Sequence, residues 1–212
     1  MTSNTEMAWQ TALVQGIAAL GLKLDSAQQA ALQTYVELLQ KWNKAYNLTA
    51  VRDPLQMVYR HLLDSLSVAP YIEHSRLLDV GSGPGLPGIP LAICFPDLQV
   101  TSLDSNSKKT RFQLQVKAEL GLTNLEVINA RAENAGLTPF PQVISRAFAS
   151  LQDMIQWTDA LCAENGVFLA MKGLYPEDEI NALPQGFTVK QTYPLRVPGV
   201  EGERHLLVLG RH

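Results

Sequence analysis

The first third of the chain carries apolar residues at helical spacing. Ser26 as N-cap with Gln29 as the third helical residue fits a capping box, which predicts a helix that begins directly after Ser26. Its apolar face then repeats every three or four residues, through Leu32, Tyr35, Val36, Leu39, Trp42 and Tyr46. A second amphipathic run follows Pro54 and stops at Pro70, with Val58, Leu62, Leu66 and Ala69 on one face. Because no strand pattern precedes about residue 76, residues 1–72 are predicted to form a helical extension.

From Arg76 onward, short apolar runs alternate with helical patterns. Helical spacing is found over Lys108–Leu120, which ends at Gly121, and over Leu151–Ala163, which ends near Gly166. The predicted strands are Arg76–Val80, Leu98–Leu103, Leu125–Asn129, Gln142–Ser145 and Gly166–Met171. Such alternation is typical of a parallel sheet covered by helices on both faces.

The tail of the chain follows a different pattern. Phe187–Tyr193 and His205–Leu209 are both strand-like, and the segment between them contains Pro198, Gly199 and Gly202 but no helical pattern. The two strands are therefore predicted to pair as an antiparallel hairpin that closes the sheet. We expect a Rossmann-like α/β fold of the class I methyltransferase type, with residues 73–212 as one compact catalytic unit. A dinucleotide-binding dehydrogenase usually keeps its sheet parallel.

Composition limits the classes of partner. With 46% hydrophobic and only 17% charged residues, the chain can build a sizeable core, and its net charge of −3 excludes a histone-like polycation. Any nucleic acid must then be bound by a local basic patch. Cys94 and Cys162 both fall within helical patterns and are expected to be buried thiols of a reducing compartment. No signal peptide or membrane-spanning stretch is seen, so a cytoplasmic protein is expected.

The motif richest in chemical information is a glycine loop that follows the first strand. In Leu77–Gly88, glycines stand at positions 81, 83 and 85, directly before a helical pattern. Glycine allows positive φ and close approach of the backbone to a ligand, and a helix N-terminus favours an anionic group. We therefore predict that Gly81, Gly83 and Gly85 bind a cofactor, and that valine at position 83 would abolish binding.

An acidic residue at the end of the second strand supports this prediction. Asp104 follows Gly81 by 23 residues, where a Rossmann carboxylate accepts hydrogen bonds from a ribose diol. The glycine order is G-x-G-x-G with Asp79 ahead of it, which matches methyltransferases better than the G-x-G-x-x-G of dehydrogenases. The third strand leads into Asn129–Glu133, where a methyltransferase normally contacts adenine. These features favour S-adenosylmethionine as the cofactor.

Longer motifs resemble one particular family. Leu78–Pro90 and Val143–Ser150 closely resemble the bacterial small-subunit rRNA guanine-N7 methyltransferase G family, also called glucose-inhibited division protein B. Lys41–Thr49, Pro176–Glu179 and Gly202–His205 are similar to the same family, and the likeness extends from about Leu32 to Leu209.

The resemblance implies an enzyme that methylates N7 of a specific guanine in 16S rRNA, within a decoding-region loop of the small ribosomal subunit. The residues that it implies as cofactor contacts are Gly81, Leu86, Ala132, Glu133 and Arg146. The expected partner is 16S rRNA in the small subunit or its precursor, and the expected state is a monomer.

The acceptor chemistry agrees with this implication. Enzymes that methylate the exocyclic N6 or N4 amine of a base usually carry Asn/Asp-Pro-Pro-Tyr/Phe after the fourth strand. This chain has Ser145–Phe148 there, which disfavours an exocyclic amine as the acceptor. Guanine N7 has an in-plane lone pair and no proton, so its methylation needs positioning rather than a base. Arg146, Lys172 and His61 are the candidate catalytic residues. Arg146 cannot donate to N7 in the reactive complex, because that hydrogen bond would occupy the attacking lone pair.

Basic residues interleaved with aromatic ones indicate where RNA could bind. The RNA-binding candidates are Arg52, Arg60, Lys108 and Lys109, with Lys41 and Lys44 on the same predicted face. Trp42 and Tyr46 lie on the apolar helical face and fit a core role better. His61 fits a structural helix histidine as well as a site residue, and a solvated surface is the safer interpretation of Lys108 and Lys109. No metal site is expected from the scattered histidines.

Three other functions remain possible from the sequence. A methyltransferase with a small-molecule acceptor would need no basic patch. An NAD-dependent oxidoreductase would bind NADH instead of S-adenosylmethionine. A non-catalytic ribosome-binding module would keep the fold without transferring a methyl group.

Overall fold

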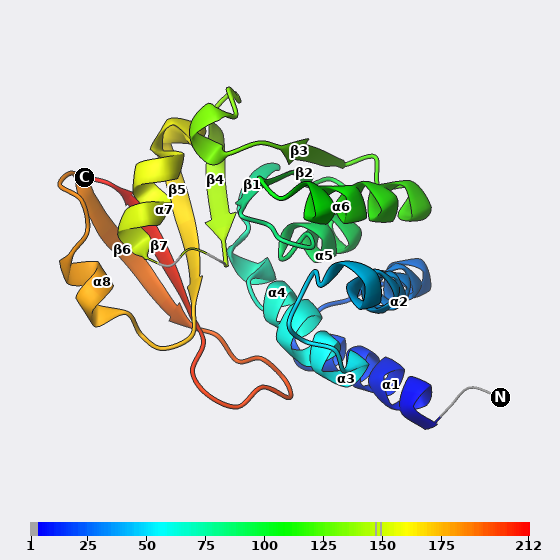
Figure 1. The fold of residues 1–212 in the computed structure, drawn as a ribbon. Coiled ribbons are helices and arrows are strands. Elements are labelled where there is room, and N and C mark those ends of the chain that lie inside the picture. The colour runs from blue at the N-terminus through cyan, green and yellow to red at the C-terminus, as the bar shows by residue number, and fades with distance from the viewer. Residues whose placement is uncertain (1–3, 147, 149) are drawn as a thin grey trace.

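A seven-stranded sheet forms the centre of the molecule in the computed structural model, which describes residues 4–146, 148 and 150–212 (Figure 1). The strand order is β3-β2-β1-β4-β5-β7-β6. The first five strands run parallel, and β7 pairs antiparallel with both β5 and β6. The bounds are β1 Arg76–Val80, β2 Gln99–Asp104, β3 Leu125–Asn129, β4 Phe140–Ser145, β5 Cys162–Lys172, β6 Phe187–Pro194 and β7 His205–Arg211. The predicted fold class and its C-terminal hairpin are confirmed.

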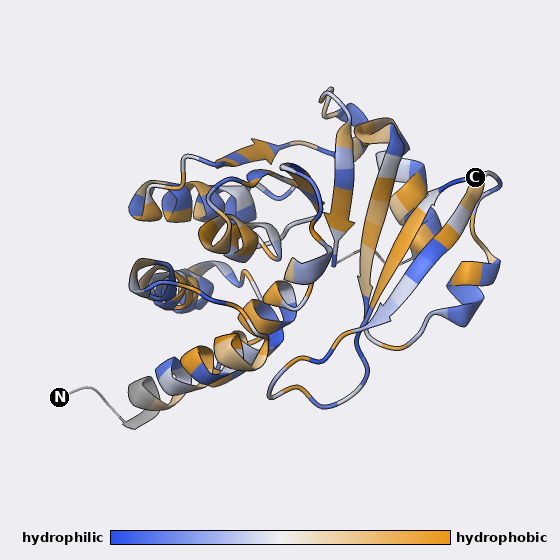
Figure 2. Cartoon of the chain, turned by 180° about the vertical axis from the view of Figure 1, so that it is seen from behind, coloured by the Kyte–Doolittle hydropathy of each residue, from blue (hydrophilic) through white to orange (hydrophobic). Residues whose placement is uncertain are grey.

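Alternating side chains of the strands supply two separate cores. Leu77 packs with the core beneath the N-terminal helices, whereas its neighbour Leu78 packs with the core beneath α7, and Leu206 and Leu207 divide in the same way. Figure 2 shows central strands that are mostly hydrophobic beside a more hydrophilic β6 at the edge. The covering helices are α5 Gly88–Cys94, α6 Ser107–Leu120, α7 Leu151–Thr158 and α8 Glu177–Asn181.

The N-terminal helices pack onto the same face as α5 and α6 (Figure 1). The helical elements are α1 Asn4–Ala19, α2 Ser26–Tyr46, α3 Pro54–Met57, a π-helical turn Val58–Leu63, α4 Asp64–Leu66 and a 3-10 turn Ala69–Tyr71. The run after Pro54 was predicted as a plain amphipathic helix, but the structure places a π turn in its middle. None of the described helices is long and apolar enough to cross a membrane.

The predicted start of α2 is wrong by one residue. Asp25, not Ser26, is the N-cap, and its Oδ1 accepts from the Gln28 backbone N–H at 2.8 Å while Gln28 Oε1 accepts from the Asp25 N–H at 3.0 Å. With Gln28 as the third helical residue, its Nε2 also donates to the Cys94 carbonyl at 2.9 Å. This bond to the end of α5 explains why the tertiary fold selects Asp25 over Ser26.

The predicted end of α7 is also wrong. The helix stops at Thr158, a 3-10 turn covers Asp159–Leu161, and Cys162 begins β5 by pairing with Phe140. Arg211 of β7 holds this corner by bonding Asp159 and the carbonyl of Ala163. Cys162 is therefore a strand residue. Burial raises the pKa of its thiol to about 11 and that of Cys94 to about 12, so both thiols stay protonated.

Candidate active site

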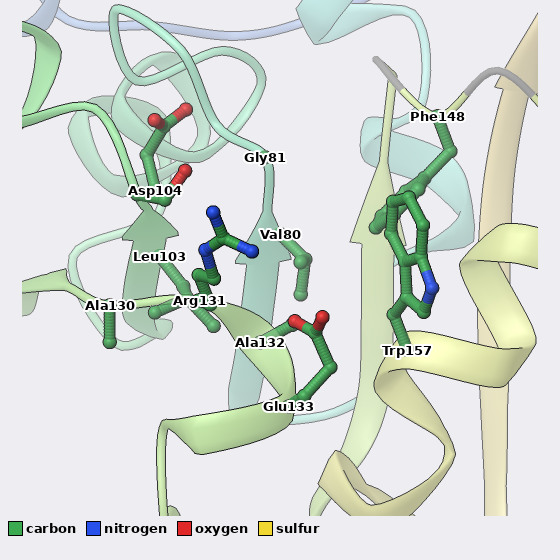
Figure 3. A pocket seen from close by; sticks show the side chains of 11 residues that line it. Val80, Gly81, Leu103, Asp104, Ala130, Arg131, Ala132, Glu133, Phe148 and Trp157 are labelled. Atoms are coloured by element: carbon green, nitrogen blue, oxygen red, sulfur yellow. The ribbon is translucent and has the colours of Figure 1, made fainter.

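A cavity of about 290 Å³ opens at the carboxyl ends of β1, β2 and β3, where ligands of open α/β sheets bind (Figure 3). It is lined by Val80, Gly81, Leu103, Asp104, Ser105, Ala130, Arg131, Ala132, Glu133, Phe148 and Trp157. Four residues that the sequence predicted as cofactor contacts meet in its wall: Gly81, Asp104, Ala132 and Glu133. We refer to this space as the first cavity. A larger hollow of about 450 Å³ lies at the opposite edge of the sheet, around Arg76 and Gln99 at the strand starts.

The glycine loop has the backbone conformation that its sequence requires. Gly81, Gly83 and Gly85 have φ of 65°, 61° and 93°, in the region that disfavours side chains. Gly83 N–H donates to Asp104 Oδ2 at 2.7 Å, and its carbonyl accepts from Gln113 Nε2 at 2.7 Å. The loop is thus fixed to β2 and α6 before any ligand binds.

The other loop residues predicted as contacts, Gly83, Gly85 and Leu86, are not among the residues that line the first cavity. A Cβ on Gly83 would meet only Lys109 Nζ, at 3.9 Å. There is therefore room for a Cβ at position 83, where we predicted that valine would abolish cofactor binding. A Cβ on Gly85 would stand 2.3 Å from Ile89 Cδ1. Leu86 is 2% exposed and belongs to the core under the N-terminal helices. These residues shape the loop in this structure.

Asp104 is positioned for a double role. Its Oδ2 accepts from Gly83 N–H and its Oδ1 accepts from Asn106 N–H, both at 2.7 Å. Each carboxylate oxygen can accept a further bond, so the group can also meet a ribose diol in the first cavity.

Asp79, the acid ahead of the glycines, is buried without full pairing. Its Oδ2 accepts from Gly88 N–H at 2.8 Å, while its Oδ1 has no hydrogen-bond partner among the described residues. Burial raises the pKa of Asp79 to about 7, against the opposing effects of the Gly88 bond and of Arg146. An unpartnered carboxylate oxygen beneath the glycine loop suits the ammonium group of S-adenosylmethionine. The residues present therefore fit this cofactor.

Two aromatic residues complete the wall, and sequence reasoning missed both. Phe148 follows β4 and Trp157 lies on α7, with ring centroids 5.7 Å apart (Figure 3). Trp157 is 44% exposed although it is large and apolar. An aromatic residue on the exposed face of an otherwise amphipathic helix was the available signal. Ala147 and Ala149, which flank Phe148 in the quoted motif, lie outside the described residues.

Arg146, which the resemblance implied as a cofactor contact, lines a second cavity. This space of about 370 Å³ is bounded by Val51, Arg60, His61, Asp64, Arg146, Met171, Lys172, Gly173, Leu195, Arg204 and His205. Arg146 Nη1 donates to the Arg60 carbonyl at 2.8 Å and to Asp64 Oδ2 at 3.1 Å. The second cavity adjoins the first, because Lys172 of the second contacts the carbonyl of Phe148, which lines the first, at 3.5 Å.

Asp64 joins distant parts of the chain in this second cavity. Its Oδ2 pairs with Arg146 after β4, and its Oδ1 lies 3.3 Å from Arg204 Nε before β7. The Asp64 side chain is 8% exposed, so the carboxylate is shielded while its two arginines stay partly accessible. Arg204 is thus a site residue that sequence reasoning did not select.

The two other catalytic candidates also lie in the second cavity. His61 Nε2 is 2.8 Å from Thr49 Oγ1, and burial lowers the pKa of His61 to about 4, with a smaller effect from Arg146. The imidazole is therefore neutral near pH 7. Lys172 Nζ forms an ion pair with Glu179 Oε2 at 2.8 Å.

The RNA-binding candidates are spread over several elements. Arg60 lines the second cavity, and exposed Arg52 follows Val51 of its wall, with Nη2 bonded to Asn47 Oδ1 at 2.8 Å. Lys108 and Lys109 open α6 behind the glycine loop. Lys41 and Lys44 are exposed on α2.

Comparison with known proteins places the chain. The family described as rRNA small subunit methyltransferase G matches residues 28–207. The chain belongs to this family. It is 54% identical over 204 residues to "Ribosomal RNA small subunit methyltransferase G" of Marinobacter nauticus, covering 96% of this chain and 95% of the relative. The protein with the same name from Pseudomonas syringae pv. syringae is 58% identical over 200 residues, covering 94% of each chain.

Comparison with solved structures shows which fold this chain has. A SAM-dependent methyltransferase from Aquifex aeolicus matches with a TM-score of 0.57 at 15% identity, over 74% of this chain and 93% of that chain. TrmN from Thermus thermophilus matches with a TM-score of 0.57 at 19% identity, over 82% of this chain and 53% of that chain. The class I methyltransferase fold is therefore shown, while these identities are too low to carry function.

Proposed function

We propose that the protein uses S-adenosylmethionine to methylate N7 of a specific guanine in the 16S rRNA of the small ribosomal subunit. The proposal rests on one central observation. In this member of the rRNA small subunit methyltransferase G family, the first cavity, with Asp104 and Glu133 in its wall, adjoins a second cavity lined by four cationic side chains, Arg60, Arg146, Lys172 and Arg204.

The first cavity supplies the cofactor contacts. Asp104, in its wall, would accept from the ribose hydroxyls, and the buried Asp79 carboxylate, which is not part of the cavity lining, would attract the ammonium group from beneath the glycine loop. Ala132 and Glu133, opposite Phe148 and Trp157, enclose the adenine ring. S-adenosylmethionine, when bound, would supply the electrophilic methyl group that the acceptor takes.

The second cavity orients the acceptor without a general base. Neutral His61 is bonded to Thr49, and Lys172 is paired with Glu179, so neither is free to take a proton. Guanine N7 needs none, because its lone pair carries no proton. Arg146 Nη1 is held by Asp64 Oδ2 and the Arg60 carbonyl, so this nitrogen is engaged away from N7. The residues here position the base and exclude water.

The proposal extends to the molecule as a whole. Arg52, Arg60, Lys108 and Lys109 contact rRNA phosphates, while Arg146 contacts the methionine end of the cofactor. The protein acts as a cytoplasmic monomer, in which residues 1–72 extend a catalytic unit of residues 73–212. Light scattering of the purified protein tests the monomer.

The decisive experiment is radiolabelled methyl transfer to unmodified small subunits and to deproteinised 16S rRNA, with mapping of the modified base. We expect label at N7 of one guanine. Label on a metabolite panel but on no RNA would favour the small-molecule acceptor. Absence of transfer in single turnover, with cofactor binding intact, would favour a non-catalytic ribosome-binding module.

A further inference from the structure

The connection from β5 to α8 presents an apolar tip at the rim of the second cavity. Gly173 lines that cavity, and the next two residues are exposed although both are large and apolar. Leu174 is 77% exposed and Tyr175 is 48% exposed. They are adjacent in the chain, whereas the other large apolar residues known to be exposed stand singly. Neighbouring exposed apolar side chains beside a functional cavity indicate a contact surface.

The tip is anchored at its base. Lys172 pairs with His205 across β5 and β7, and His205 Nδ1 lies 2.9 Å from the Gly173 carbonyl. The ring of Tyr175 stands edge-on to that of His205, with centroids 5.6 Å apart and an angle of 71° between the planes. The aromatic ring is therefore held by the strand pair that also forms the cavity wall.

Charge around the tip favours a polyanion. The second cavity carries Arg60, Arg146, Arg204 and Lys172, against the carboxylates of Asp64 and Glu179. Cationic side chains together with an aromatic ring are the combination on which proteins bind unpaired nucleotides, with the cations on phosphates and the ring on a base.

The geometry of the acceptor requires an unstacked nucleotide. In a paired A-form helix, guanine N7 faces a deep, narrow groove that side chains do not enter. A guanine bound in the second cavity must leave its stack, and the neighbouring base loses its stacking partner. An apolar group at the rim of the cavity can replace that partner.

We propose that Leu174 and Tyr175 form a stacking platform for the nucleotide adjacent to the methylated guanine. This inference rests on the proposed function. Tyr175 supplies the ring on which the base stacks, and Leu174 covers the edge of that base. His205 and Gly173 hold the platform at the cavity rim.

The test compares platform variants with a matched surface variant. Tyr175→Ala should weaken binding of unmodified 16S rRNA roughly tenfold, the scale found when an aromatic stacking partner is removed. Leu174→Ser should weaken it by a smaller factor, because Leu174 covers only the edge of the base. Tyr175→Phe should bind like the wild type, because the ring is kept. Leu114→Ser, which changes a 50% exposed leucine on α6, should have no effect. The Kd for S-adenosylmethionine should stay unchanged in all four variants, which also verifies folding.

The outcomes separate the two proposals. Wild-type rRNA binding and methylation rates in both Tyr175→Ala and Leu174→Ser would overturn the platform while leaving the proposed function standing. Equal losses in Tyr175→Phe and Tyr175→Ala would also overturn it, because the hydroxyl and not the ring would then matter. Failure of the wild type to bind and methylate both unmodified small subunits and deproteinised 16S rRNA would overturn both proposals.

Discussion

At the scale of single residues, three aspartates perform different tasks because their surroundings differ. Asp64 is neutralised by two arginines, Asp104 accepts two backbone N–H groups, and Asp79 is buried with one oxygen unpartnered. Burial raises the pKa of Asp79 to about 7. Asp79 is therefore a carboxylate whose protonation a bound cation would change near neutral pH.

We expect cofactor binding to release a proton from Asp79. Below about pH 7 the free protein holds this proton, and an ammonium group beside the carboxylate favours the ionised form. Affinity for S-adenosylmethionine should then rise as the pH increases toward about 7 and level off above it. Calorimetry at pH 6.5 in two buffers of different ionisation enthalpy measures the release. Asp79→Asn should abolish it, and an unchanged release in that variant would assign the proton to another group.

Asp104→Ala should weaken S-adenosylmethionine binding by about 1.5–3 kcal/mol, the range for hydrogen bonds to a charged group. The variant should also lose about 1–3 kcal/mol of unfolding free energy, because the buried Gly83 N–H loses its acceptor. Calorimetry and urea unfolding measure the two effects, and Asp104→Asn, which keeps one acceptor oxygen, should restore part of each. Lower stability with unchanged affinity would limit Asp104 to holding the loop.

At the scale of elements, periodicity and glycine spacing predict the framework well. The bounds of β1 and β3 agree with the prediction, and α6 ends at Gly121 with φ of 61°, as expected for a helix terminated by glycine. The features that could not be predicted from the sequence depend on contacts between residues far apart in the chain. Gln28 reaching Cys94 selects the helix start, and Arg211 bonding Asp159 ends α7 early. Likewise, pairing of Asp64 with Arg146 joins positions 82 residues apart, which no local pattern records.

The glycine loop offers a matched pair of substitutions. Gly83→Ala should cost about 1–2 kcal/mol of stability, since φ is +61°, but should keep cofactor affinity because its Cβ meets only Lys109. Gly85→Ala should weaken cofactor binding, because φ is +93° and its Cβ would overlap Ile89, so that the buried Ile89 side chain or the loop must move. Binding assays and thermal unfolding of both variants test this contrast. Equal loss of affinity would mean that positive φ, and not crowding, controls the loop.

At the scale of the whole molecule, the N-terminal helices are built into the site. Tyr35 of α2 donates to the Pro84 carbonyl of the glycine loop at 2.9 Å. The connection between β6 and β7 extends toward the N-terminal helices (Figure 1), where Gly199 packs against the ring of Tyr59. Arg204, from the end of that connection, reaches Asp64. The second cavity therefore forms where the N-terminal helices and the connection between β6 and β7 meet the end of β4.

The placement of basic residues makes a prediction about RNA binding at the same scale. The net charge of −3 gives no general attraction to RNA, so affinity must come from local phosphate contacts. Such contacts release counterions, and removing one should reduce the slope of log K against log salt by about one unit.

Arg52→Ala and Arg60→Ala should each show this reduction together with slower methylation of small subunits. Exposed Lys190 on the edge strand β6 lines neither cavity and provides Lys190→Ala as the control. A salt titration of subunit binding measures the slopes, while the Kd for S-adenosylmethionine should remain constant. Slopes and rates equal to wild type in both arginine variants would place the phosphate contacts elsewhere, with α6 and its Lys108 and Lys109 as the next surface to test.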